Sequence, residues 1–171
     1  MSLNVCCFTG HRPGKLGFGE NSIECRALKA KTEELIIRLI EEKGINYFIS
    51  GMALGVDMYA AEIVIKLKER YPQIKLECAL PCANQTAKWN DSDKEAYRKI
   101  IDACDKAVLL QEEYTNDCMQ RRNRYMVDNS GVVLAVWNGK PSGTGSTVRY
   151  ARSKGVAVLL LDPVSLIDKY I

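Results

Sequence analysis

The sequence predicts a three-layer α/β domain of Rossmann-like topology, in which helices cover both faces of a mainly parallel sheet. Six short apolar runs, rich in β-branched residues and bounded by turn or polar residues, have the composition of buried strands. Helical patterns separate these runs, and such alternation implies right-handed crossovers between parallel strands. The expected strands span Leu3–Thr9, Ile45–Ser50, Ile74–Leu80, Lys106–Leu110, Val132–Trp137 and Val156–Leu161.

Apolar residues at helical spacing indicate the first two helices. Asn21 with Glu24 is the expected start signal of the first helix, and Gly44 is its expected stop. The second helix follows apolar spacings of four, three and four over residues 60–71, and Pro72 ends it. Both helices are long enough to cross back between parallel strands.

Three more helices follow in the second half of the chain. Ser92 and Glu95 form a capping box at the expected start of the third helix. The fourth is expected over residues 117–129, and the last over about 145–154, where Gly155 stops it. Each of the expected strands is therefore joined to the next through a helix.

The third strand is the one that the pattern places at an edge. Ile74 and Leu76 alternate with Lys75 and Glu77, whereas the other strands are more continuously apolar. An edge position for this strand fits the order 3-2-1-4-5-6. In that order, ligands bind outside the carboxyl ends of the strands, near the switch point beside strand one.

Length and composition fit one domain that covers residues 1–171. The chain has 171 residues and is 47% apolar, which suffices for a full core. Its longest apolar run is shorter than the roughly 20 residues needed to cross a bilayer, and the N-terminus lacks the pattern of a signal peptide. We therefore expect a cytoplasmic protein without a membrane partner.

Cysteine usage and charge narrow the choice of ligands. The seven cysteines are an odd number without a Cys-x-x-Cys pair, which indicates reduced thiols rather than a disulfide framework or a zinc site. We expect no metal and no obligatory cofactor. The net charge of +3 is far from the basic bias of a dedicated nucleic-acid binder, so DNA is a less favoured partner than a small molecule.

Three glycine-bearing loops follow expected strands one, two and five, at residues 9–14, 50–57 and 139–147. Glycine lets the backbone approach a ligand closely, and a helix that starts after such a loop offers unpaired N–H groups to an anion. None of the loops has the Gly-x-Gly-x-x-Gly fingerprint or a Gly-Lys-Ser/Thr ending. The loops predict a rim for a phosphate-bearing small molecule, without a standard nicotinamide or P-loop signature.

The fourth helix adds a basic residue to this rim. Met119, Arg122, Asn123 and Met126 have the spacing of one helical face, and the two methionines should point inward. Holding Arg122 and Asn123 on the same face costs desolvation energy unless they meet an acceptor. We expect a ligand or partner contact there, with an internal ion pair as the alternative.

Two parts of the chain resemble motifs of known families. Ser50–Asp57 closely resembles the Ser-Gly-x-Ala-x-Gly-Ile-Asp segment of the Smf/DprA DNA-processing proteins. Arg122–Met126 and Pro141–Ser146 are similar to the Arg-Lys-x-x-Met and Pro-Gly-Gly-x-Gly-Thr motifs of LOG proteins, which are phosphoribohydrolases. Both families belong to the SLOG superfamily. The whole layout, including the Thr-Gly-His-Arg-Pro opening, most resembles its short bacterial YpsA-like branch.

The resemblance implies a Rossmann-like domain that binds a nucleotide or a nucleotide-derived ligand. It implies that the backbone of residues 143–146 and the Arg122 side chain surround a phosphate, with Ser50, Gly51 and Gly55 on the sugar side. The expected ligand-binding residues are Thr9, Gly10, His11, Arg12, Ser50, Gly51, Met52, Gly55, Asp57, Arg122, Asn123, Gly143, Thr144, Gly145 and Ser146.

One position departs from the LOG pattern. Arg149 stands where the LOG motif has the glutamate that serves glycosidic cleavage. A guanidinium cannot stabilise a cation-like ribosyl centre or activate water, so a replacement would have to come from Asp57, Glu62 or His11. Asp57 and Glu62 start the helix after strand two, where a cap or a solvated first-turn charge also explains them. His11 could bind phosphate, shuttle a proton or only make surface hydrogen bonds.

Three functions remain open at this point. The first is a sensor or carrier of a nucleotide-derived ligand, and it leaves room for a homo-oligomer or a protein partner. The second is a LOG-like hydrolase of a nucleotide N-glycosidic bond with altered catalytic residues. The third is a Smf/DprA-like module for single-stranded DNA, which predicts binding with strong salt dependence.

Overall fold

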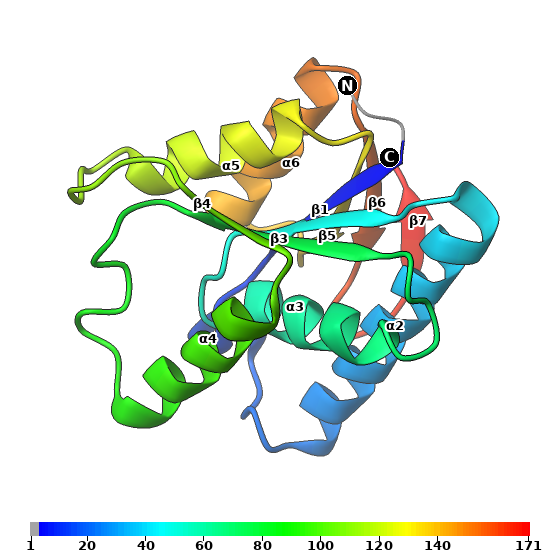
Figure 1. The fold of residues 1–171 in the computed structure, drawn as a ribbon. Helices are drawn as coiled ribbons and strands as arrows, with labels where there is room; N and C mark the ends of the chain where they lie inside the picture. The colour runs from blue at the N-terminus through cyan, green and yellow to red at the C-terminus, as the bar shows by residue number, and fades with distance from the viewer. Residues whose placement is uncertain (1–3) are drawn as a thin grey trace.

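Within residues 4–171, which the computed structural model describes, the chain folds into a seven-stranded sheet between two layers of helices (Figure 1). All six expected strands are present, with ends shifted by one or two residues, and Leu3 lies outside the described residues. A short seventh strand was not predicted. The strands are β1 Val5–Gly10, β2 Tyr47–Ser50, β3 Lys75–Leu80, β4 Lys106–Leu109, β5 Val132–Val136, β6 Ala157–Leu161 and β7 Asp168–Tyr170.

The helices divide between the two faces of the sheet (Figure 1). The helices α2, α3 and α4 pack side by side on one face, whereas α5 and α6 pack together on the other. Each layer encloses its own set of buried apolar side chains against the sheet. The helices are α1 Pro13–Leu16, α2 Ile23–Lys43, α3 Val56–Leu67, α4 Asp91–Ala103, α5 Cys118–Asp128 and α6 Gly143–Ser153.

The strand order is β4-β3-β2-β1-β5-β6-β7, and every neighbouring pair is parallel except β6 with β7. The fold class is confirmed, as is the run β3-β2-β1. The position of the fourth strand differs from the expected order, because β4 lies beyond β3 and leaves β5 beside β1. The chain thus builds outward to β4 before it returns to the centre of the sheet.

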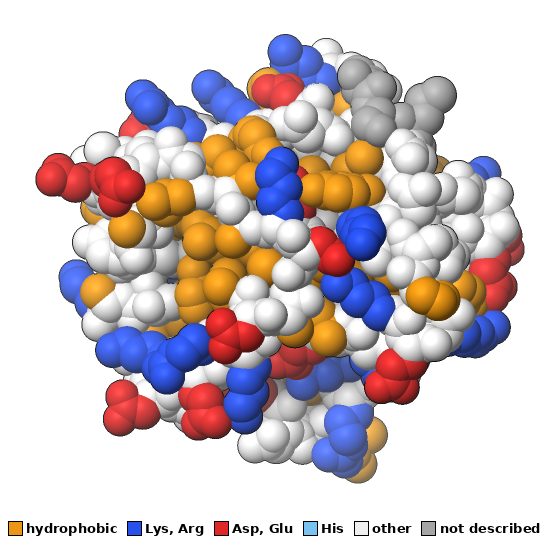
Figure 2. Space-filling view, in the orientation of Figure 1, with side chains coloured by type: hydrophobic (Ala, Val, Ile, Leu, Met, Phe, Trp, Pro, Cys, Tyr) orange, Lys and Arg blue, Asp and Glu red, His pale blue; other side chains and the backbone are white. Residues whose placement is uncertain are grey.

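The edge assignment of β3 was wrong because Glu77 is buried rather than solvated. Its side chain is 3% exposed and accepts hydrogen bonds from the hydroxyls of Tyr47 (2.6 Å) and Tyr125 (2.7 Å). Lys106 on β4 pairs with it at 3.2 Å. A polar alternation therefore marks a satisfied buried carboxylate here. The edge is β4, and hydrophobic side chains gather in the middle of the face that it borders (Figure 2).

Several helix ends also differ from expectation. The N-cap of α2 is Ser22 rather than Asn21, and its side chain accepts from Cys25 N at 3.1 Å. Asn90 caps α4 in place of the expected capping box at Ser92 and Glu95. A side chain one or two residues away with the same capping chemistry took the role in both helices. The stop of α2 at Gly44 and the span of α5 are confirmed.

All seven cysteines lie among the described residues and are free thiols. Over residues 4–171, no helix is both long and apolar enough to cross a membrane.

Candidate functional site

The three glycine-bearing loops meet at one edge of the sheet. Because β2, β1 and β5 are parallel neighbours, their carboxyl ends lie together. Hydrogen bonds from backbone N–H groups join the loops directly. Val56 N donates to His11 O at 3.3 Å, and Asn138 N donates to the His11 ring at 3.3 Å. The unexpected position of β5 beside β1 is what brings the third loop into this contact.

Two of the glycines are required where the loops press together. Gly55 has a φ of +93°, and a Cβ atom there would lie 2.6 Å from His11 O. A Cβ atom on Gly51 would lie 2.5 Å from the guanidinium carbon of Arg122. A side chain at Gly55 would clash with backbone, whereas a side chain at Gly51 would force the Arg122 side chain to move. The loop after β2 thus forms a support beneath the site, and Gly51 makes room for Arg122.

A cavity of about 160 Å³ opens where the loops meet α5 and α6. Nine of its thirteen lining residues are among those expected from the sequence. Three of the lining side chains are basic and one is a carboxylate, so positive charge predominates. The lining residues are Thr9, Gly10, His11, Arg12, Lys15, Ala53, Asp57, Met119, Arg122, Asn123, Ser142, Gly143 and Thr144.

Arg122 is the most deeply buried cation of this cavity, with 3% of its surface exposed. It donates from one terminal nitrogen to Gly51 O and from Nε to Asn123 Oδ1 at 2.8 Å. Burial lowers the pKa of its guanidinium, and the nearby Asp57 carboxylate opposes that shift. Among residues 4–171, no carboxylate lies within ion-pair distance of Arg122. Its charge is therefore only partly compensated by the protein.

Asp57 is the acidic residue of the cavity and is 5% exposed. Burial raises the pKa of its carboxyl, whereas Arg122 and the hydrogen bond from Ala53 N (3.4 Å) lower it. The side chain does not cap α3, whose N-cap is Gly55. Asp57 therefore faces the cavity as a carboxyl whose burial favours the protonated form.

His11 is 3% exposed and ties the first loop to the third. Its Nε2 atom accepts the hydrogen bond from Asn138 N, so the ring proton is on Nδ1 in the neutral form. Burial lowers the pKa of the imidazole, while the contact with Asn138 raises it and Lys15 lowers it. His11 is thus a neutral linker between two loops that also lines the cavity.

The N-terminus of α6 supplies backbone donors. Ser142 caps the helix, since its hydroxyl accepts from Gly145 N at 3.1 Å and its carbonyl accepts from Ser146 N at 3.0 Å. The first N–H groups of a helix have no partner within it. Those of Gly143 and Thr144 lie at the lining of the cavity, where the helix dipole favours negative charge.

Several expected residues lie beneath or beside the cavity rather than in its wall. Ser50 is fully buried and donates to Asp57 O at 2.8 Å, so it fixes the second loop from below, together with Met52. Gly145 packs against Trp137. Each of these residues holds the loops in place, and none of them faces the cavity.

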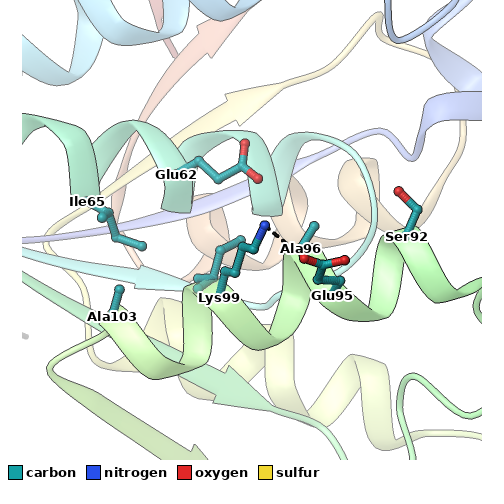
Figure 3. Close-up of a pocket in the computed structure, with 8 residues that line it drawn as sticks. Glu62, Ile65, Ser92, Glu95, Ala96, Lys99 and Ala103 are labelled. Carbon is teal, nitrogen blue, oxygen red and sulfur yellow. Dashed lines mark ion pairs between the residues drawn. The ribbon is translucent and has the colours of Figure 1, made fainter.

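Glu62 is not brought to the rim. It lies in a separate groove of about 420 Å³ between α3 and α4, near the ion pair of Lys99 with Glu95 (3.0 Å; Figure 3). Six residues of helix separate it from the start of α3, which carries it away from the loops. Among the three acid–base candidates, only Asp57 and His11 line the cavity.

Sequence reasoning missed four lining residues, namely Lys15, Ala53, Met119 and Ser142. Lys15 belongs to the short helix α1, directly after the first loop, and a basic residue so close to that loop was a usable signal. Over the described part of the chain, no cluster of three or more His, Cys, Asp and Glu side chains is placed to hold a metal ion.

A second and larger groove adjoins the cavity. It has a volume of about 640 Å³ and runs between α5 and α6. Met119, Asn123 and Gly143 line both spaces, so the two are adjacent at this point. Ser146, expected at the phosphate, lies in this groove.

Fold and site together define a Rossmann-like α/β protein with a cationic pocket at the carboxyl ends of its central strands. The chain belongs to the YspA SLOG family, whose model matches residues 6–157. It is 31% identical over 147 residues to the UPF0398 protein BH1768 of Halalkalibacterium halodurans, covering 84% of this chain and 77% of that protein. It is 33% identical over 137 residues to the uncharacterized SPbeta prophage-derived protein YoqJ of Bacillus subtilis, covering 73% and 80%.

Solved structures of DNA processing protein A share the fold. The Streptococcus pneumoniae protein superimposes with a TM-score of 0.65 at 16% identity, over 95% of this chain and 53% of its own. The Helicobacter pylori protein gives 0.61 at 19% identity, over 94% and 66%, and its structure is described for a single-stranded DNA binding mode. The present chain thus spans about half of the first neighbour, and the likeness concerns the fold.

Proposed function

We propose that the protein is a cytoplasmic sensor or carrier that binds a nucleotide-derived ligand with a phosphate in the three-loop cavity. The observation that carries this proposal is Arg122, a buried guanidinium without an ion-pair partner among residues 4–171, which lies at a cavity beside the N-terminus of α6. A buried charge is costly unless an opposite charge compensates it. A phosphate would meet Arg122, Arg12 and the first N–H groups of α6 together.

The volume of the cavity fits the phosphate of such a ligand, without its sugar and base. About 160 Å³ holds a phosphate with little more, so the sugar and base would extend beyond it. Asp57 lies in the same wall and would repel a fully charged phosphate unless its carboxyl is protonated, a state that burial favours. The site therefore fits one anionic group held mainly by Arg122 and backbone N–H donors.

The test measures the binding of AMP, ADP-ribose and NAD to the wild-type protein and to the Arg122→Ala variant. Calorimetry gives the affinities, and thermal unfolding gives the stabilisation by each ligand. We expect the substitution to weaken phosphate-bearing ligands by about 1.5–3 kcal/mol, the range for hydrogen bonds to charged groups. Arg121→Ala is the matched control, because Arg121 lies next along α5 but is exposed and paired with Asp117 at 2.7 Å. Equal affinity in a folded Arg122→Ala protein would refute the site.

A single-stranded DNA module is the second candidate, and the fold shared with DNA processing protein A supports it. The same cavity would then hold one backbone phosphate of a strand. Anisotropy of a labelled oligonucleotide should show affinity that falls with salt, at a slope of about −0.7 per phosphate contact. Absence of binding even at low salt would remove this candidate.

A further inference from the structure

The groove between α5 and α6 adjoins the phosphate cavity. Met119, Asn123 and Gly143 line both, so the groove is the neighbouring space into which the rest of a ligand anchored in the cavity can extend. The groove is about four times as large, at about 640 Å³ against about 160 Å³. Whatever extends from a phosphate in the cavity has room there.

The charges in this groove are all of one sign. Arg124 and Arg149 line it, and none of its lining residues is an aspartate or a glutamate. Arg149 donates to Ser146 Oγ at 3.0 Å, and the Arg124 guanidinium lies 5.5 Å from the centre of the Tyr150 ring. In the described part of the chain, neither arginine has a carboxylate within 4.0 Å.

Two carboxylates of α5 and its N-cap have other partners. Asp117 pairs with Arg121, and Asp128 accepts from the Tyr150 hydroxyl at 2.9 Å. Arg124 and Arg149 keep most of their donors free for an anion that enters the groove. Two forked guanidinium groups are well suited to a phosphate.

The length of α6 sets the spacing between the two anionic positions. Thr144 lies at the cavity, whereas the guanidinium groups of Arg149 and Arg124 lie against Ser146 and Tyr150, two and six residues further along α6. These positions are about 3 and 9 Å from Thr144 along the helix axis, so an anion held between the two guanidinium groups is about 6 Å away. The phosphates of a nucleoside diphosphate share one bridging oxygen and lie closer together than this. Phosphates on the two sides of a ribose are farther apart and suit this spacing better.

We propose that the ligand carries two phosphates separated by a ribose, one in the cavity at Arg122 and one in the groove at Arg124 and Arg149. This inference rests on the proposed function, because the first phosphate is the one described there. The shared chemistry occurs in a free nucleoside 3′,5′-bisphosphate and in each internal unit of a single-stranded nucleic acid. Binding of the two sources is separable by experiment.

The experiment compares AMP, ADP and adenosine 3′,5′-bisphosphate by calorimetry on the intact protein. We expect the bisphosphate to bind about tenfold or more tightly than AMP, and ADP to gain less. Arg149→Gln and Arg124→Gln should each remove most of the gain of the bisphosphate over AMP, measured on the same variant. Arg152→Gln is the matched control, since Arg152 is an exposed arginine of α6 outside the groove; it should retain the gain.

The possible outcomes separate the two proposals. Equal binding of AMP and the bisphosphate, or a gain that survives both groove substitutions, overturns the two-phosphate ligand while the phosphate cavity stands. Failure of all three compounds to bind overturns both proposals. A short oligonucleotide then identifies the source: a gain over the bisphosphate that grows with length supports a strand, whereas no gain supports the free nucleotide.

Discussion

Two grooves between neighbouring helices, on opposite faces of the sheet, differ in how their charges are balanced. The groove between α3 and α4 contains Lys99 paired with Glu95, and Glu62 adds a further carboxylate (Figure 3). The groove between α5 and α6 contains two arginines and no carboxylate. The first groove holds charges of both signs and its lysine is already paired, whereas the uncompensated cations of the second groove gain from an anion.

The three-loop cavity can be compared in the same way, and its balance of positive and negative side chains lies between those of the two grooves. Asp57 stands against Arg12, Lys15 and Arg122, and it lies too far from Arg122 for an ion pair. Cavity and groove adjoin and together form a cationic surface that starts at the sheet and extends along α6. The α3–α4 groove is the internal reference against which the effect of substitutions in that surface is measured.

Gly51→Ala should have the largest effect, because the added Cβ atom would lie 2.5 Å from the Arg122 guanidinium carbon. Arg122 would have to leave its place and lose its bond to Gly51 O. We expect a loss of about 1–3 kcal/mol in unfolding free energy from overpacking, together with loss of phosphate binding. Denaturant unfolding and calorimetry measure both effects.

Gly14→Ala is the control for that substitution, because Gly14 lies in the short helix α1 with open space around its Cβ position and no positive φ. It should leave both binding and stability within about 0.5 kcal/mol of wild type. If Gly51→Ala bound phosphate as well as Gly14→Ala does, Arg122 would not be the anchor of the cavity.

Asp57→Asn tests the one carboxylate of the cationic surface. At a pH where the Asp57 carboxyl is ionised, removing its negative charge beside the anion should tighten AMP binding severalfold, about 0.5–1 kcal/mol, whereas removing a surface charge far from the site should not. If the protein also cleaves the N-glycosidic bond of its ligand, the same variant should lose release of free base while it still binds. Weaker AMP binding in a folded Asp57→Asn protein would show that the carboxylate holds the ligand instead.

The pH dependence of stability should report His11, the single histidine of the chain. Burial holds the pKa of its imidazole below the ordinary value, so the unfolded chain binds the proton more readily than the folded one. Its contribution is therefore present near neutral pH and is lost as pH falls from about 7 toward about 5. His11→Gln retains an acceptor for Asn138 N and should reduce this slope.

The buried carboxyl of Asp57 acts in the opposite direction, because its raised pKa makes acid stabilising. The informative quantity is thus the difference in unfolding free energy between wild type and His11→Gln at each pH. A difference that stays constant from about pH 7 to about pH 5 would show that His11 does not titrate in a buried position.

The sequence predicted the positions of the strands along the chain better than it predicted which strands are neighbours in the sheet. Apolar periodicity placed six strands within one or two residues, yet it put β3 at the edge, because Lys75 and Glu77 have the pattern of a solvated strand face. Glu77 is buried by two tyrosines and a lysine that come from distant parts of the chain. Such partners are fixed by tertiary packing and leave no mark in local periodicity.

The candidate site was predictable for a different reason. A loop after a parallel strand always reaches the same edge of the sheet, so Thr9, Asp57 and Thr144 could be assigned to one edge without knowledge of the strand order. Their meeting in one cavity depends on β5 lying beside β1. Glu62 could not be placed in this way, since its distance from the rim depends on how far α3 carries it. The sequence also could not predict that the groove arginines lack ion pairs, because which carboxylates lie near them depends on the packing of α5 on α6.

Lys99→Gln in the α3–α4 groove should have the smallest effect of all. The pair of Lys99 with Glu95 is an exposed i,i+4 contact, and such pairs contribute about 0.3–0.5 kcal/mol. Unfolding free energy should fall by no more than that, and the affinity for AMP or adenosine 3′,5′-bisphosphate should not change. A loss of ligand affinity comparable to that of Arg149→Gln would mean that the α3–α4 groove also takes part in binding. The balance of charges within a groove would then no longer distinguish the two faces of the sheet.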